Sequence, residues 1–155
     1  ISPDKKYSER PMALKLTAEE VSAFLIELFP GWSKYYDVLS LDEQGMRLKM
    51  FVGERHLRPG GTVSGPAVFA MVDAGAYLLT MAHIGREAMT VTSNCSIDYM
   101  RKPVAGADII GEFRLLKLGR TLCVMDVLVY SEGDPAPVAR ANITYAIPPA
   151  RQKAD

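Results

Sequence analysis

The stretch TVSGPAVFAMVDAGAYLLTMAHIG, which runs from Thr62 to Gly85, constrains the fold of this chain more than any other segment. Between Pro66 and Ile84 almost every side chain is apolar or small, and the only carboxylate is that of Asp73. Proline is favoured in the first turn of a helix, where its missing N–H would have no partner, and glycine commonly ends helices. These residues predict a helix of roughly 19 residues, about 28 Å long.

A helix of this length would be long enough to cross a membrane, which takes about 20 apolar residues. However, five of its residues are alanine, and Asp73 at the centre would disfavour insertion by roughly 2.5–3.5 kcal/mol. We therefore interpret the segment as a helix surrounded by its own protein and expect no membrane partner. A buried carboxylate is costly unless it is hydrogen-bonded or paired, so Asp73 has either a structural partner or a function.

The composition narrows the function classes further. The chain has 155 residues, 48% of them hydrophobic and 23% charged, which predicts a single globular domain over residues 1–155. Eighteen basic and eighteen acidic residues leave no net charge, so we expect no nucleic-acid partner. Cys95 and Cys123 form neither a CxxC motif nor a Cys/His cluster, so we expect no metal. Free thiols and the lack of a signal-like opening segment predict a cytoplasmic protein.

The segments around the central helix show the periodicities of a helix and several strands. A polar arm at residues 1–15 precedes a capping box at Thr17 and Glu20, which starts an amphipathic helix, and Pro30-Gly31 is expected to stop it. Period-two patterns and turn residues predict strands at 35–41, 46–52, 89–99, 108–118, 121–130 and 138–147, followed by a polar tail at 148–155.

One long apolar helix needs cover on several sides, and the links between the later strands are of hairpin length. We therefore expect an α+β fold in which a curved antiparallel sheet wraps around the central helix, with the N-terminal helix at its flank. The strand at 89–99 alternates apolar and polar residues, which predicts one polar face that carries both Thr92 and Asn94.

The segment GGTVSGPAVFAMVDAGAY resembles the G-T-x-H-G-G motif of the hotdog-fold acyl-CoA thioesterases, and within them the PaaI-like branch. Gly61-Thr62 and Gly65 match this motif, and Asp73 falls on the family's acidic position. Residues 95–103, CSIDYMRKP, resemble the family's strand and the turn after it. The resemblance implies a hotdog fold, hydrolysis of an acyl-CoA thioester with no cofactor beyond the CoA of the substrate, and a homodimer. We expect a dimer of dimers, a homotetramer, although the sequence leaves dimer and tetramer open.

Gly65 and Asp73 suit the two tasks of thioester hydrolysis. The Gly65 backbone N–H, at the start of a helix, can stabilise a developing oxyanion, and glycine allows a substrate to come close. Asp73 can act as a general base on water or as a nucleophile through an anhydride, and the sequence leaves both open. Because the two residues lie about 12 Å apart along a helix, we expect donor and carboxylate to come from different subunits of a homodimer.

Other candidates surround this pair. Thr92, where the family often has Ser or Thr, is expected to reach Asp73 or its water, although it equally fits a solvated strand face. Asn94 is a second candidate on the same face. Ser64 is expected to cap the helix or contact the substrate, beside Pro66, which fixes the first turn and removes one possible donor. Loop cations that could meet CoA phosphates, each also compatible with ordinary surface charge, are Arg58, Arg101, Lys102 and Arg120.

Three positions differ from the family pattern and leave an alternative open. Arg58, Ser64 and Pro66 stand where the family has Asn, His and a second Gly. A hotdog domain that binds an acyl-CoA or acyl ligand without turnover is therefore the alternative function. A Ser64 nucleophile with His56 and Asp73 is a further possibility, but the sequence lacks the G-x-S-x-G turn of such enzymes.

Overall fold

The structure, a computed structural model, describes residues 13–149 of the chain. Most of the predicted N-terminal arm and of the polar tail lies outside these residues. Every predicted strand is present, with its ends shifted by at most two residues. The elements are α1 (Ala18–Leu28), α2 (Pro30–Ser33), β1 (Tyr36–Leu41), β2 (Gly45–Met50), a 3₁₀ turn (Glu54–His56), α3 (Gly65–Ile84), β3 (Val91–Tyr99), β4 (Ile109–Leu118), β5 (Leu122–Ser131) and β6 (Pro137–Ala146).

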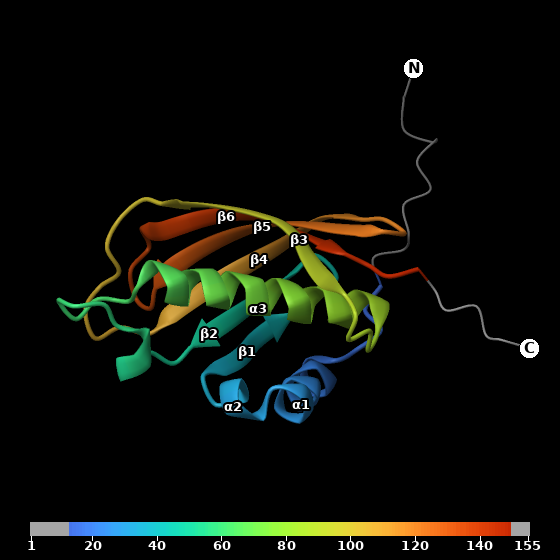
Figure 1. Ribbon diagram of the computed structural model, residues 1–155, viewed down its shortest axis with the longest axis horizontal. Helices are drawn as coiled ribbons and strands as arrows, with labels where there is room; N and C mark the ends of the chain where they lie inside the picture. Colours follow the sequence, from blue (N-terminus) through green and yellow to red (C-terminus); the bar gives the residue numbers. More distant parts are fainter. Residues whose placement is uncertain (1–12, 150–155) are drawn as a thin grey trace, which may run out of the picture.

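The six strands form one antiparallel sheet in the order β1-β2-β4-β5-β6-β3. The sheet curves over one side of α3, and α1 and α2 lie beside α3 next to β1 (Figure 1). The predicted α+β arrangement, a curved antiparallel sheet around one long helix, is therefore confirmed. Among the described residues, strand β3 is an edge strand that pairs only with β6, so no strand of residues 13–149 covers its other edge.

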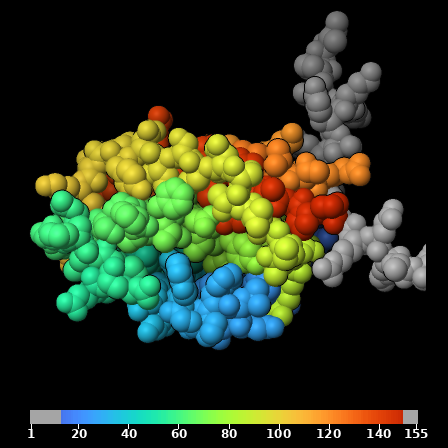
Figure 2. Space-filling view, viewed as in Figure 1, coloured from blue at the N-terminus to red at the C-terminus, as the bar shows by residue number. Residues whose placement is uncertain are grey.

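Helix α3 is the core of the molecule. Ser64 is its N-cap, and Gly85 follows its last residue with φ 89°, a conformation that favours glycine. Among the described residues it is the one helix long and apolar enough to span a membrane, but 61% of that window is buried inside the protein. Phe69, Asp73 and Tyr77, four residues apart, share the helix face that is not fully covered. Figure 2 shows this side of α3 as a green band between α1–α2 (blue) and β3 (yellow).

Gly75 brings α3 against the sheet, and its replacement by alanine tests how tightly the two layers pack. A Cβ added at Gly75 would lie 2.0 Å from Cζ of the buried Phe113 ring. The Phe113 ring also packs closely against Gly111, where an added Cβ would lie 2.7 Å from the ring atom Cε2. The ring is therefore enclosed between two glycines and has little room to move away from Gly75. Alanine is favoured over glycine in a helix by about 1 kcal/mol, but overpacking costs about 1–3 kcal/mol or more.

We therefore expect Gly75→Ala to lower the free energy of unfolding by about 2 kcal/mol. Urea unfolding followed by circular dichroism measures this change. Gly31→Ala is the control, because a Cβ at that position meets no atom within 4 Å. Equal or higher stability of Gly75→Ala would contradict the close packing of Phe113 on the helix.

The region before β1 differs from the sequence prediction in one respect. Thr17 caps α1 as expected, its hydroxyl accepting a hydrogen bond from the Glu20 N–H at 3.2 Å. The predicted stop at Pro30-Gly31 is confirmed for α1, which ends at Leu28, but a short second helix that was not predicted, α2, begins at Pro30. Proline is compatible with the first turn of a new helix, so the chain bends at Phe29 and continues as a short second helix. The two helices place Phe29 and Trp32 beside α3, where they line a pocket.

The predicted two-faced pattern of β3 holds from Asn94 onward but is wrong at Thr92, because the strand contains a β-bulge between these residues. In the pairing with β6, Thr92 lies opposite Tyr145 and Asn94 lies opposite Thr144, so Ser93 is an extra residue. Such a residue shifts the alternation of side chains by one position. The Thr92 side chain therefore turns inward to α3, where it contacts Asp73, while Val91 is 57% exposed. Thr92 and Asn94 consequently lie on opposite faces of the strand, whereas the period-two pattern had predicted that they share one face.

Candidate active site

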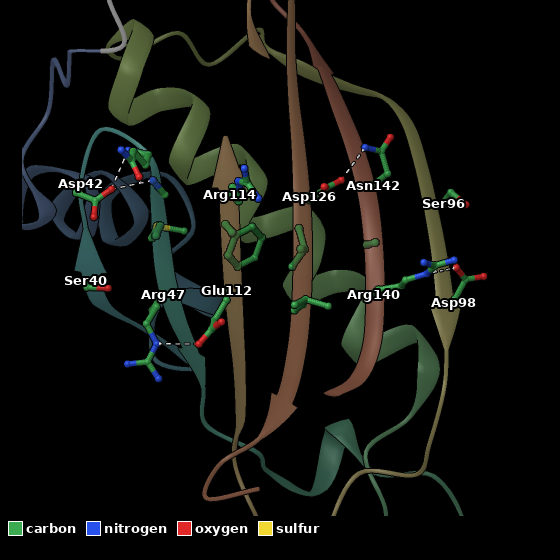
Figure 3. A pocket seen from close by; sticks show the side chains of 17 residues that line it. Ser40, Asp42, Arg47, Ser96, Asp98, Glu112, Arg114, Asp126, Arg140 and Asn142 are labelled. Carbon is green, nitrogen blue, oxygen red and sulfur yellow. Dashed lines mark hydrogen bonds and ion pairs between the residues drawn. The ribbon is translucent and has the colours of Figure 1, made fainter. Parts of the chain in front are cut away.

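Two hollows are present on the described surface, and they differ in character. The larger, about 820 Å³, lies on the outer face of the sheet and is lined by charged and polar side chains (Figure 3). Four of its charged groups form ion pairs at exposed positions, Arg140 with Asp98 at 2.8 Å and Arg47 with Glu112 at 3.4 Å. Exposed pairs of this kind contribute little to stability, and the hollow contains no buried ionisable group.

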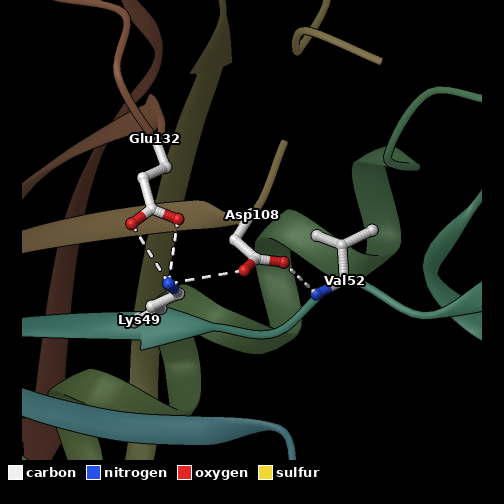
Figure 4. A network of polar contacts seen from close by, with 4 residues as sticks. All are labelled: Lys49, Val52, Asp108 and Glu132. Atoms are coloured by element: carbon white, nitrogen blue, oxygen red, sulfur yellow. Dashed lines mark hydrogen bonds and ion pairs between the residues drawn. The ribbon is translucent and has the colours of Figure 1, made fainter. Parts of the chain in front are cut away.

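A second polar network lies at the end of β2 and is also structural. Lys49 Nζ pairs with Glu132 at 2.9 Å and with Asp108 at 3.4 Å (Figure 4). The Asp108 carboxylate in turn accepts a hydrogen bond from the Val52 backbone N–H at 2.8 Å. The hydrogen bond to Glu132 raises the pKa of Lys49. The two carboxylates therefore share the single positive charge of Lys49, and the network joins β2 to the start of β4 and the end of β5.

The smaller hollow, about 600 Å³, is mostly apolar and contains one carboxylate, that of Asp73. It lies between α3, the α1–α2 segment and the start of β3. Such a pocket, with few polar groups among aromatic walls, is the usual form of a small-molecule site. Its lining residues are Leu25, Phe29, Trp32, Tyr36, Phe69, Ala70, Asp73, Ala74, Tyr77, Thr90, Val91, Thr92 and Tyr145.

The Asp73 carboxylate is held by two hydroxyl groups on one of its two oxygens. Thr92 Oγ1 donates to Asp73 Oδ1 at 2.5 Å, and Tyr145 Oη donates to the same oxygen at 2.6 Å. Tyr145 Oη also lies 2.9 Å from the Asp73 carbonyl oxygen. Within residues 13–149, Oδ2 accepts no hydrogen bond, and no cation pairs with the carboxylate. Asp73 is thus oriented through one oxygen, while the other has no hydrogen-bond partner among the described residues.

The sheet explains why these two hydroxyls meet at Asp73. Thr92 and Tyr145 are paired across β3 and β6, and residues opposite each other in adjacent strands point to the same face. Tyr145 ends the inward-facing row of β6 after Ala139, Ala141 and Ile143. The sequence analysis missed Tyr145. A tyrosine that ends an otherwise aliphatic row was the available signal, because a buried hydroxyl needs a partner.

The tyrosines of the pocket are held in their neutral form. Burial and the hydrogen bond to Asp73 raise the pKa of Tyr145 well above its ordinary value. Burial also raises the pKa of Tyr36 to about 12, with a smaller contribution from the charge of Asp73. Both hydroxyls therefore remain protonated in neutral and moderately alkaline solution, and Tyr145 stays a hydrogen-bond donor to the carboxylate.

The start of α3 has the features expected of a donor site. The Ser64 hydroxyl accepts from the Ala67 N–H at 3.2 Å, so Ser64 caps the helix as predicted. The Gly65 N–H has no protein acceptor within the described residues, as expected for the first helical position. Tyr99 at the end of β3 donates to the Gly65 carbonyl oxygen at 2.9 Å. Pro66 is exposed beside it.

The remaining candidates are divided between the two ends of the molecule. Asn94 is exposed, and the bulge separates it from the Asp73 side. Arg58, Arg101 and Lys102 are exposed in segments near the start of α3, and Arg101 Nε donates to the Pro137 carbonyl oxygen at 2.8 Å. Arg120 lies in the turn between β4 and β5, at the opposite end of the sheet (Figure 1). One chain therefore does not gather all four cations.

The histidines have structural roles. His56 Nδ1 accepts from the Gly53 N–H at 2.8 Å, and the His83 ring nitrogens contact the carbonyl oxygens of Leu79 and Glu43 at 2.9 and 3.0 Å. Within the described residues no hydrogen bond joins the Ser64 hydroxyl, the His56 ring and the Asp73 carboxylate. This arrangement gives no support to a serine nucleophile. Residues 13–149 also contain no cluster of three or more metal-binding side chains.

Comparisons with known proteins agree with this architecture. The profile of the thioesterase superfamily matches residues 60–138, about half of the chain. A solved structure from Silicibacter sp. TM1040, inferred to be a thioesterase, is 49% identical, with 93% of this chain and 100% of that chain covered and a TM-score of 0.85. Zebrafish thioesterase superfamily member 2 is 26% identical over 86% of this chain and 99% of its own, with a TM-score of 0.75. No curated protein matches.

A more distant structure adds a ligand. A hypothetical thioesterase from Streptococcus pneumoniae TIGR4, solved with coenzyme A, is 20% identical over 88% of this chain and 100% of that chain, with a TM-score of 0.69. The likeness at this identity concerns the fold, which is the hotdog fold predicted from the sequence. The family match and the relative at 49% identity go further and support thioester hydrolysis as the general activity. The chain belongs to the thioesterase superfamily.

Proposed function

We propose that this protein hydrolyses an acyl-CoA thioester to the free acid and CoA, with Asp73 as general base or nucleophile. The observation that carries the proposal is the Asp73 carboxylate itself. It lies in an apolar pocket, one oxygen is fixed by two hydroxyls, and the other accepts no hydrogen bond from the described residues. Asp73 is half-buried, and Oδ2 is not one of the fully buried atoms without a partner, so this oxygen is open to water or substrate in the pocket.

The oxyanion donor in this proposal is the Gly65 N–H of a partner subunit. Within one chain, Asp73 follows Gly65 by eight residues on an unbroken helix, about 12 Å along its axis. A thioester carbonyl must lie about 3 Å from the donor and close to the attacking group. Two antiparallel copies of α3 related by a two-fold axis would bring the donor of one subunit to the carboxylate of the other.

The surface beside the pocket supports such a homodimer. The outer edge of β3 is unpaired, and open edges are surfaces on which another strand can pair. Apolar side chains with large exposed areas lie on or near it, including Val91, Tyr99 and Phe69 of the neighbouring helix. A two-fold pairing of β3 with its copy would cover these side chains and extend the sheet. A further pairing into tetramers and a cytoplasmic location remain predictions.

The CoA part of the substrate is proposed to lie near the start of α3. The coenzyme A held by the S. pneumoniae relative shows that this fold accommodates the ligand in another protein. In this chain Arg58, Arg101 and Lys102 are exposed near that end and can meet phosphate groups. Arg120 would come close only if a second subunit contributed it. The comparisons are also consistent with the PaaI-like branch predicted from the sequence.

A panel of acyl-CoA substrates tests the proposed function. Free thiol release is measured for short, long and aromatic acyl groups, and we expect turnover with kcat in the ordinary range of about 1–10³ s⁻¹ for at least one. Binding of a non-hydrolysable acyl-CoA analogue is measured in parallel by calorimetry. Tight binding without thiol release from any substrate would contradict the proposal and favour the alternative of a binding domain.

A further inference from the structure

Two hydroxyl groups from different strands converge on the same oxygen of Asp73, and only one of them was suggested by the sequence. Tyr145 lies at the end of β6, is 3% exposed, and packs its ring 6.0 Å from that of Tyr77. Its hydroxyl is directed away from the aliphatic core and toward the helix, where it lies 2.6 Å from Asp73 Oδ1. Without a polar partner, a hydroxyl at this depth would be destabilising.

We propose that Tyr145 is a positioning residue for the hydrolysis, one that fixes which Asp73 oxygen reacts. This inference rests on the proposed function. With Oδ1 bound by Tyr145 and Thr92, the carboxyl group cannot rotate without breaking both hydrogen bonds. Oδ2 is then the oxygen that meets water or the thioester carbonyl.

The hydroxyl of Tyr145 has a second acceptor within reach. It carries one proton and lies 2.6 Å from Asp73 Oδ1 and 2.9 Å from the Asp73 carbonyl oxygen. When Asp73 is charged, the proton is directed to Oδ1, the closer and more negative oxygen. When the carboxyl group is protonated, the same hydroxyl can turn its proton to the backbone carbonyl. Tyr145 is therefore never left without a partner, and it remains in place through the reaction.

The other ionisable groups that face Asp73 do not take over this role. Tyr77 lies on α3, Tyr36 on β1 and Cys95 on β3, and burial raises the pKa of each, so each is neutral in neutral solution. Arg55 lowers the pKa of Tyr35, and at Tyr36 it opposes the larger effect of burial. No ion pair joins Arg55 to Asp73 in the described residues. The hydroxyls of Tyr145 and Thr92 are thus the groups that contact the carboxylate directly.

Replacement of Tyr145 by phenylalanine tests the proposal, because it keeps the ring and removes only the hydroxyl. We expect kcat for acyl-CoA hydrolysis to fall about tenfold, the loss expected for one hydrogen bond to a charged group, while KM stays unchanged because the hydroxyl orients the carboxylate rather than binding the substrate. A crystal structure of the variant records the orientation of the Asp73 carboxyl group, which we expect to differ from that of the wild type. Tyr130→Phe, a strand tyrosine outside both hollows, is the control and should leave both readouts unchanged.

A second variant covers the case in which Tyr145→Phe folds poorly. Site-specific 3-fluorotyrosine at position 145 keeps the hydroxyl, so the orientation of the carboxyl group and kcat should stay at their wild-type values. In the folded variants, a carboxyl orientation and a kcat that do not follow the presence of the hydroxyl would overturn the proposal, whatever happens to stability. Because the crystal structure does not require turnover, it decides the role of Tyr145 even if no acyl-CoA is hydrolysed, in which case the proposed function alone has failed.

Discussion

Replacing Asp73 with asparagine is expected to reduce kcat for acyl-CoA hydrolysis by about 10³-fold, with little change in KM. Asparagine has nearly the same shape, and its side-chain carbonyl oxygen can accept the hydrogen bonds of Thr92 and Tyr145. The local structure should therefore survive, and only the ability to take a proton or attack the thioester is lost. Initial rates of thiol release and the melting temperature measure the two effects separately.

The control for this experiment is a carboxylate on the other face of the sheet. Asp126 on β5 lies in the outer hollow, where it accepts a hydrogen bond from Asn142 Nδ2 at 3.2 Å. Asp126→Asn should change kcat by less than about twofold. If Asp73→Asn kept more than about a tenth of the wild-type kcat, a general-base or nucleophilic role for Asp73 would be untenable.

The second large effect is expected when the N–H of residue 65 is removed. In the double variant Gly65→Pro, Pro66→Gly, proline occupies the first helical position, where it is favoured, and follows Ser64, whose ψ of 155° is compatible with a following proline. A Cβ at position 65 would contact the Tyr99 ring at 3.5 Å, an ordinary distance. The fold should persist, and loss of one oxyanion donor should lower kcat about 10²-fold. Pro66→Gly alone keeps the donor and is the matched control.

Mixing the two inactive proteins tests whether each site is built from two subunits. In a heterodimer of Asp73→Asn with the double variant, one site carries both lesions and the other carries none. Random reassociation of equal amounts should therefore restore roughly a quarter of the wild-type activity. Reassociation is checked by mass spectrometry of differently tagged subunits. Mixed dimers without recovered activity would show that donor and carboxylate do not come from different chains.

Much of the fold could be predicted because its signals are local. Ser64, Pro66 and Gly85 mark the ends of α3 by the geometry of helix termini alone. The apolar content of this helix then requires a sheet that curves around it. Asp73 could be identified for a similar reason, because a single carboxylate in an apolar helix must have a partner or a function.

The rest of the candidate site depends on contacts between distant parts of the chain. Tyr145 lies 72 positions after Asp73, and the register of β6 with β3 brings them together. The bulge after Thr92 inverts the side-chain alternation of β3, which a period-two pattern cannot show. The pocket wall formed by Phe29 and Trp32 was missed because Pro30 suggested the end of a helix rather than the start of another.

The placement of Gly65 and Asp73 on one uninterrupted helix has a consequence for how such proteins can vary. An extra residue anywhere between them would rotate Asp73 by about 100° around the helix axis and displace it by about 1.5 Å. It would then miss the hydroxyls of Thr92 and Tyr145, although the helix would still form. We therefore expect functional homologues to keep these eight steps free of insertions and deletions, while the loop before Ser64 and the turns between strands differ in length.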